Sequence, residues 1–131
     1  SFRGGFWRYT FERLIAINLV YTNRANNSNC SLLHVESDVL LLPNFPFSRL
    51  KNLSHIHWLP VNSDKDAASL MYFPNARLTG DFVNDLHNYL ETTNEVNDMR
   101  ALRFLRLNFP SKYRLLPTFN SNFPKLCNLI S

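Results

Sequence analysis

The stretch LLHVESDVLLL, residues 32–42, reads as a buried strand into which three ionisable side chains have been placed. In a strand, residues two apart point to the same face, so His34, Glu36 and Asp38 are predicted to share one side. Charged groups in such a setting cost several kcal/mol unless they are paired or bind a metal. This segment therefore decides both the fold and the search for a site.

Two of these side chains lie close enough to share one ion. A two-residue step along a strand advances about 6.6 Å, so Glu36 and Asp38 can converge near the carboxyl end, whereas His34 is about 13 Å from Asp38. Carboxylate oxygens favour hard cations such as Mg²⁺ and Mn²⁺, and open α/β sheets bind ligands beyond the carboxyl ends of their strands. The segment predicts a divalent-cation site, although two surface carboxylates at a strand-to-loop junction explain it equally well. For His34, a hydrogen-bonded core histidine is the simpler interpretation.

Composition limits the class of protein. The chain has 131 residues, 45% of them hydrophobic, which suits a single domain over residues 1–131 with a real core. The three glycines, at positions 4, 5 and 80, do not have the spacing of a Rossmann or P-loop fingerprint. No apolar run approaches the roughly 20 residues that span a bilayer. The net charge is +4, but Arg100, Arg103 and Arg106 are best explained as a solvated helix face, so no nucleic-acid partner is predicted.

The hydrophobic spacing predicts the order of elements along the chain. Helices are expected from Thr10 to about Tyr21, from Thr79 to about Leu90, and from Asn97 to the residue before Pro110, with Thr10, Thr79 and Asn97 as caps. Strands are expected at residues 32–42, 55–61 and 69–73, a helical turn at 48–53, an extended piece at 115–119 and an irregular or helical tail at 122–131. This order predicts an α/β domain with a mixed sheet and packed helices.

Four segments in this order resemble the GT-A glycosyltransferases, the nucleotide-diphospho-sugar transferases. They are FWRYTFERLIAINLV (6–20), LLHVESDVLLLPNF (32–45), SLMYFPNARLTGDFVNDLHNYL (69–90) and NDMRALRFL (97–105). In that family a helix precedes a buried strand that ends in a D-x-D motif, and the resemblance covers roughly residues 6 to 118. Its members usually begin with a nucleotide-binding half, so we expect this chain to be the central and later part of a larger glycosyltransferase domain with a partial GT-A-like fold.

The resemblance implies a function and a set of site residues. Glu36 stands in place of the first acid, a longer side chain than the family's Asp, and Asp38 in place of the metal-binding acid. Both would hold Mn²⁺ or Mg²⁺ on the diphosphate of a nucleotide-diphospho-sugar donor. Asp98 falls where many members bring an acid to the acceptor, so it would be the catalytic base that activates the acceptor hydroxyl. An Asp in the first turn of a helix is also a common stabilising preference, which leaves a structural role open for Asp98.

The implied activity is metal-dependent transfer of a sugar to an acceptor hydroxyl on a sugar, lipid or protein. Two alternatives from other classes remain: a non-catalytic or truncated α/β binding module with structural acids, and a metal-dependent hydrolase that uses the same carboxylates. Arg13 and Arg77 can neutralise a diphosphate, but surface or ion-pair roles are simpler for both. The sequence does not decide between the cytoplasm and the Golgi lumen as the location of the protein.

Overall fold

The computed structural model describes residues 2–24, 30–94 and 97–116, and the side chains of 8–21, 30–94 and 97–116. Its elements, in chain order, are α1 (Phe2–Arg24), β1 (Leu32–Val35), α2 (Phe47–Leu50), β2 (Ile56–Pro60), β3 (Asp66–Phe73), α3 (Ala76–Thr92), α4 (Asp98–Asn108) and β4 (Tyr113–Leu115). The predicted mixed α/β class, with helices packed on a sheet, is confirmed.

The sheet has four strands in the order β1-β3-β2-β4. β3 runs antiparallel to both β1 and β2, while β4 is parallel to β2. The strands β1, β2 and β4 therefore share one direction, and their carboxyl ends lie at the edge of the sheet where β3 begins. This edge positions the candidate site described below.

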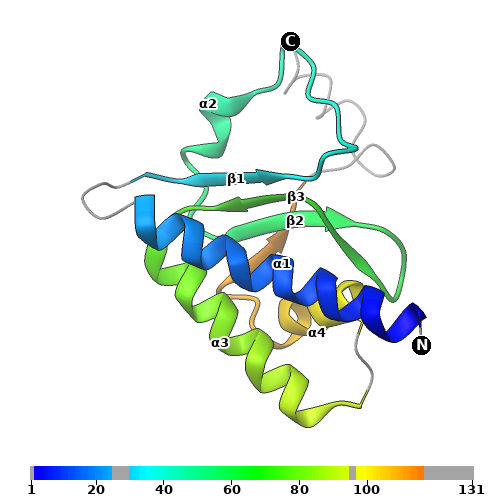
Figure 1. Cartoon of the computed structure of the whole chain (residues 1–131). Coiled ribbons are helices and arrows are strands. Elements are labelled where there is room, and N and C mark those ends of the chain that lie inside the picture. The colour runs from blue at the N-terminus through cyan, green and yellow to red at the C-terminus, as the bar shows by residue number, and fades with distance from the viewer. Residues whose placement is uncertain (1, 25–29, 95–96, 117–131) are drawn as a thin grey trace.

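The helices α1, α3 and α4 cover one face of the sheet, and α2 lies with the preceding loop on the other side (Figure 1). The core between sheet and helices is aromatic at its centre, where the Trp58 ring stacks on Tyr113 at 5.2 Å and tilts against Phe82 at 6.1 Å. From the helices the same cluster receives mainly leucines: Leu14, Leu78, Leu86, Leu102 and Leu105. Burial of this apolar surface is the dominant stabilising term of the fold.

The two faces of β1 follow from its register with β3. Leu32 pairs with Phe73 and His34 with Met71, so these four side chains share the face that carries the helices. His34 therefore lies among apolar neighbours, two residues before Glu36. On the opposite face, Leu70 and Tyr72 are also buried.

Two buried carboxylates tie helices to the sheet. Asp66, fully buried at the start of β3, accepts hydrogen bonds from Trp58 Nε1 at 2.9 Å and from Arg106 of α4 at 2.7 and 3.1 Å. Because Arg106 forms this bidentate pair with a buried acid, its charge is not part of an exposed basic face. Of the other two arginines in that set, Arg100 lies 3.8 Å from Asp64.

The second buried carboxylate belongs to α3. Asp85 accepts a hydrogen bond from the Tyr113 hydroxyl at 2.5 Å and another from Lys112 Nζ at 2.9 Å. Burial is the largest cause that raises the pKa of Tyr113, and the Asp85 carboxylate raises it further. This contact fixes α3 against the segment that leads into β4.

Several predicted boundaries were wrong. The first helix begins at Phe2 rather than at Thr10. The N-cap of α3 is Asn75, whose side chain accepts from Leu78 N at 2.9 Å, while Thr79 lies inside the helix and donates to the Asn75 carbonyl. Asn97 is the N-cap of α4, as predicted. The expected extended piece at 115–119 lies mostly, and the tail at 122–131 wholly, outside the described residues.

The predicted strand at 32–42 was too long, since β1 ends at Val35. The backbone turns directly afterwards, where Val39 N donates to the Glu36 carbonyl at 3.0 Å. Glu36 and Asp38 were expected to share one face of a strand. This expectation is wrong, because both residues lie beyond the end of β1 and Asp38 is in the turn. Ser37 and Asp38 occupy this turn, and both are residue types that favour turns.

Candidate functional site

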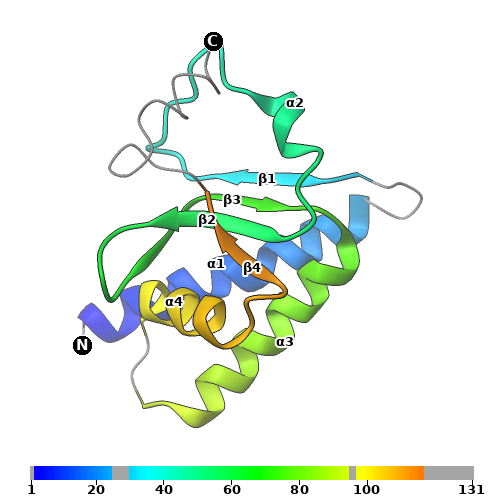
Figure 2. The same cartoon turned by 180° about the vertical axis from the view of Figure 1, so that it is seen from behind.

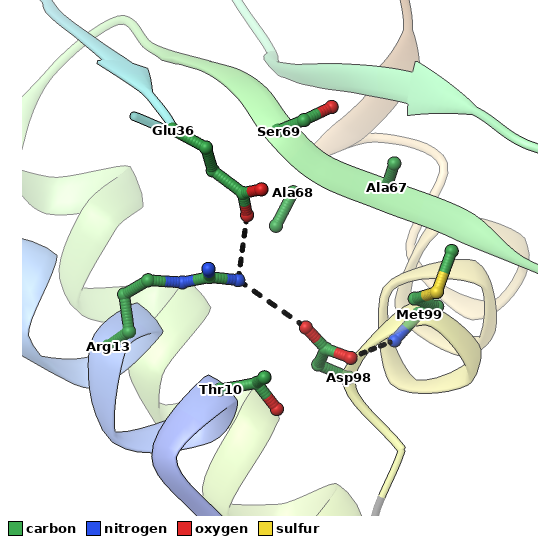
Figure 3. Close-up of a pocket in the computed structure, with 8 residues that line it drawn as sticks. All are labelled: Thr10, Arg13, Glu36, Ala67, Ala68, Ser69, Asp98 and Met99. Atoms are coloured by element: carbon green, nitrogen blue, oxygen red, sulfur yellow. Dashed lines mark hydrogen bonds and ion pairs between the residues drawn. The ribbon is translucent and has the colours of Figure 1, made fainter. Parts of the chain in front are cut away.

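Glu36 occupies the position directly beyond the carboxyl end of β1. Its N–H donates to the Ser69 carbonyl at 3.0 Å, so β3 fixes its backbone although it no longer belongs to the strand. Its side chain points toward α1, where Arg13 Nη2 lies 2.8 Å from Glu36 Oε1 (Figure 3). Glu36 is half-buried in this arrangement, so it retains some access to solvent.

Asp98 approaches the same guanidinium from the start of α4. Its Oδ2 lies 3.6 Å from Arg13 Nη2, and its Oδ1 accepts from Met99 N at 2.9 Å. The side chain is only about 6% exposed. Burial raises the pKa of Asp98, whereas the Met99 N–H and the Arg13 charge act in the opposite direction. Two predicted site residues, Glu36 and Asp98, are thus brought together by an arginine.

A hollow of about 210 Å³ lies around these three side chains. Figure 3 shows the Arg13 guanidinium between the two carboxylates, with the Ala68 side chain of β3 pointing toward them. The complete lining is Thr10, Arg13, Glu36, Ala67, Ala68, Ser69, Asp98 and Met99. Ala67, Ala68 and Ser69 belong to the part of β3 that extends past the end of β1. The small side chain of Ala68 points toward Arg13 and leaves space beside it.

Asp38 borders a second hollow, next to the first, and its side chain is exposed to solvent. That second space, about 390 Å³, is lined by Arg13, His34, Val35, Glu36, Ser37 and Asp38. Glu36 and Arg13 border both hollows, Asp98 borders the first, and Asp38 borders the second. Glu36 and Asp38, the two acids predicted to bind a metal, therefore line one common space. The turn after β1 brings them there, and not a shared face of one strand.

The donor chemistry of this second hollow is compatible with a hard divalent cation. Glu36 and Asp38 supply carboxylate oxygens, the ligands that Mg²⁺ and Mn²⁺ prefer, and the exposure of Asp38 lets it reach an ion. Glu36 already contacts Arg13, so an ion would compete with the guanidinium for that oxygen. Among the described residues, no group of three or more His, Cys, Asp or Glu side chains is arranged to hold a metal.

His34 and Arg13 each bury a nitrogen that lacks a protein partner. The unpaired atoms are His34 Nε2 and Arg13 Nε. Burial is the main cause that lowers the pKa of His34, and the Arg13 charge lowers it further, while Glu36 raises it. The predicted hydrogen bond for a core histidine is thus missing at Nε2, which leaves this atom desolvated without compensation.

Sequence reasoning assigned Arg13 to an ion pair or the surface and did not connect it with Glu36 or Asp98. Its position one residue before the buried Leu14 gives no sign of a partner on another element. Arg77, the other candidate for a diphosphate contact, is 77% exposed and lies 3.9 Å from Asp81 in its own helix. Arg13 is therefore the cation that belongs to the site.

Two further findings concern the chain as a whole. Within residues 2–24, 30–94 and 97–116, no helix combines the length and apolarity needed to cross a membrane. No protein-family model, no curated protein and no solved structure gives a significant match to this sequence.

Proposed function

We propose that this chain supplies the metal-binding and acceptor-activating part of a glycosyltransferase that moves a sugar from a nucleotide-diphospho-sugar to an acceptor hydroxyl. The observation that supports the proposal is the gathering of Glu36 and Asp98 beyond the carboxyl end of β1, with Asp38 in the following turn. Ligands of open α/β sheets bind at this edge. The resemblance of the segment order to the GT-A enzymes supplies the reaction class.

Each acid has a separate role in this proposal. Asp38 and Glu36 hold Mn²⁺ or Mg²⁺, which when bound neutralises the diphosphate of the departing nucleotide. Asp98 accepts the proton of the acceptor hydroxyl. The upward displacement of its pKa by burial suits this role, because a general base works best when its pKa approaches the operating pH.

Because Arg13 contacts Glu36, the two proposed metal-binding acids differ in how readily they can bind an ion. A cation that binds Glu36 must displace or share the guanidinium contact at 2.8 Å, whereas Asp38 is exposed in its turn. We therefore assign Asp38 as the direct ligand and give Glu36 a weaker role, through water or a nucleotide hydroxyl. Loss of charge at a direct ligand costs more affinity than loss at an indirect one.

The decisive measurement is a thermal-shift titration of the chain with Mn²⁺ and uridine or guanosine diphosphate, alone and together. We expect stabilisation only when metal and nucleotide are both present, since ligands that bind the folded state stabilise it by mass action. Glu36→Gln should weaken the joint affinity by no more than about tenfold and Asp38→Asn by considerably more. Asp64→Asn, a substitution at an exposed acid away from both hollows, is the matched control.

Two results would count against this assignment. If Glu36→Gln and Asp38→Asn lose the same amount of affinity, the two acids do not have unequal roles. If the thermal stabilisation survives both substitutions, neither acid belongs to the metal site. Absence of stabilisation with every combination would contradict nucleotide binding by this chain.

A non-catalytic binding module is the second candidate, and one observation favours it. Arg13 pairs with Glu36 and also lies within 4 Å of Asp98, so each carboxylate already has a cationic neighbour within the protein. In that case Asp38→Ala leaves the thermal response to Mn²⁺ and nucleotide unchanged. A hydrolase that uses the same acids would instead release sugar from the donor to water without any acceptor hydroxyl.

A further inference from the structure

The loop between β1 and α2 exposes large apolar side chains. Within residues 39–47, Leu40 is 84% exposed, Leu42 63% and Phe47 51%. The loop and α2 lie on the side of the sheet opposite to α1, α3 and α4, and they extend away from it (Figure 2). Large exposed apolar side chains that lie close together along the chain are candidates for binding a partner or a membrane.

This loop holds its apolar side chains in a defined conformation. Phe45 N donates to the Leu42 carbonyl at 3.0 Å, which closes a turn with Pro43 and Asn44 at its centre, residues that favour such turns. The half-buried ring of Phe45 contacts that of Phe47 edge-on at 4.7 Å. The exposed side chains are therefore presented by a fixed backbone, which reduces the entropy that binding would cost.

The charges that directly follow the loop are both positive. Arg49 and Lys51 follow it directly, both are exposed, and the sequence contains no Asp or Glu between Asp38 and Asp64. An apolar projection followed by two cations is complementary to an anionic bilayer, because the apolar groups enter the acyl boundary and the cations meet the headgroup phosphates. The exposed acid beside it, Asp38, lies at the other end of the loop.

We propose that residues 39–51, the apolar loop with Arg49 and Lys51, bind the surface of an anionic lipid membrane. Leu40, Leu42 and Phe47 enter the interfacial layer, and Lys51 stays at the level of the headgroups. The inference stands on exposure and charge alone and does not depend on the transfer reaction. If both proposals hold, the turn that carries Asp38 is attached directly to the membrane contact.

Flotation of the whole chain with lipid vesicles tests this proposal. We expect binding to vesicles of phosphatidylcholine mixed with phosphatidylserine, weaker binding to pure phosphatidylcholine, and loss of binding as salt rises. The double variant Leu40→Asn, Leu42→Asn should lower the partition coefficient more than about tenfold, because two apolar side chains no longer enter the interface. The matched control Leu19→Asn, Val20→Asn alters exposed apolar residues on α1 and should bind like the unaltered chain.

A second pair of variants tests the electrostatic part. Lys51→Gln should lower binding to the anionic vesicles about fivefold, equivalent to about 1 kcal/mol for one charge, without affecting pure phosphatidylcholine. Arg114→Gln removes one exposed charge from β4 and should have no such effect.

Three outcomes would overturn the proposal. The unaltered chain fails to float with the anionic vesicles, the Leu40→Asn, Leu42→Asn variant binds as well as the α1 control, or the chain binds no vesicle and forms a dimer that the loop variant abolishes. The last result would identify the loop as a contact between copies of this chain. Circular dichroism confirms that each variant keeps its fold.

Discussion

Arg13 Nη2 lies 2.8 Å from Glu36 Oε1, so one ion pair joins the long helix α1 to the end of strand β1. The same nitrogen lies 3.6 Å from Asp98 Oδ2, which adds the start of α4 to the contact. Three elements distant in sequence thus meet at one guanidinium. Because Arg13 is 38% exposed, solvent screens the interaction in part.

Removal of the Arg13 charge should destabilise the protein in a pH-dependent way. Arg13→Met leaves Glu36 and the buried Asp98 facing each other without a cation, which should lower the free energy of unfolding by about 1–3 kcal/mol at neutral pH. The loss should shrink as pH falls, because burial raises the pKa of Asp98 and protonation of this carboxyl removes its charge. Urea unfolding at several pH values measures it. Arg8→Met, at an exposed pair with Glu12, should leave stability unchanged, and a pH-independent loss in Arg13→Met would contradict the charge argument.

The Asp66 cluster gives a sharper contrast between two nearby acids. Asp66→Asn removes the charge that Arg106 contacts in the buried network, so the free energy of unfolding should fall by about 3 kcal/mol or more. Asp64→Asn, two residues earlier, acts on a side chain 59% exposed at 3.8 Å from its arginine and should be nearly neutral. Guanidinium unfolding of both variants provides the comparison. Equal losses would mean that burial of Asp66 does not set its contribution.

The order of elements could be predicted because local signals agree with the fold. Leu102 and Leu105 recur at helical spacing after Asn97, whose short side chain caps α4, and both leucines are fully buried. β3 shows no alternation with a sheet period, since Leu70 to Phe73 are all buried, and it is indicated instead by a short apolar run that Pro74 ends. Where a capping residue and the spacing of apolar residues both indicate the same helix, the local preference agrees with the tertiary packing.

The end of β1 could not be predicted, since the apolar run 39–42 has the composition of a strand although the chain turns at Ser37 and Asp38 before reaching it. The pairing of β1 with β3 ends at Val35, opposite Leu70. Leu40 and Leu42 remain exposed and do not enter the core. Pairing depends on β3, which the local pattern of residues 32–42 does not encode. For the same reason the sequence identified Glu36 and Asp98 as candidates but not the Arg13 contact that brings them together.

Tyr113 should control stability at alkaline pH. Burial and Asp85 hold its pKa above the ordinary value near 10, so the unfolded chain loses this proton first as pH rises. The folded state then binds more protons, and the free energy of unfolding should decrease as pH rises beyond about 10. Tyr113→Phe should flatten this decrease and cost about 1–3 kcal/mol at neutral pH, because Asp85 loses its shortest hydrogen bond.

The control for Tyr113 is Tyr9→Phe, at a residue 71% exposed on α1, which should alter neither the neutral stability nor the alkaline slope. Urea unfolding between neutral and alkaline pH, with tyrosinate absorbance recorded in parallel, measures both quantities. An alkaline slope that is the same in Tyr113→Phe and in the unaltered chain would contradict the assignment to Tyr113.

His34 should control stability on the acid side. Its pKa is lowered mainly by burial, so as pH falls the unfolded chain takes up a proton at its ordinary value near 6.5 before the folded chain does. The unfolded state then binds more protons, and the free energy of unfolding should fall as pH decreases below about 6.5. Burial lowers the pKa of His57 as well, so both histidines contribute to this slope.

His34→Leu should therefore reduce the acid slope without abolishing it, because His57 keeps its share. The variant should also be at least as stable as the unaltered chain near pH 5.5, since it removes the unpaired Nε2 and places an apolar side chain beside Met71. Urea unfolding between about pH 5 and 7.5 measures the slope, and His87→Gln, at an exposed histidine of α3, is the control. An unchanged slope in His34→Leu, or an equal change in His87→Gln, would show that proton uptake at His34 does not govern stability in acid.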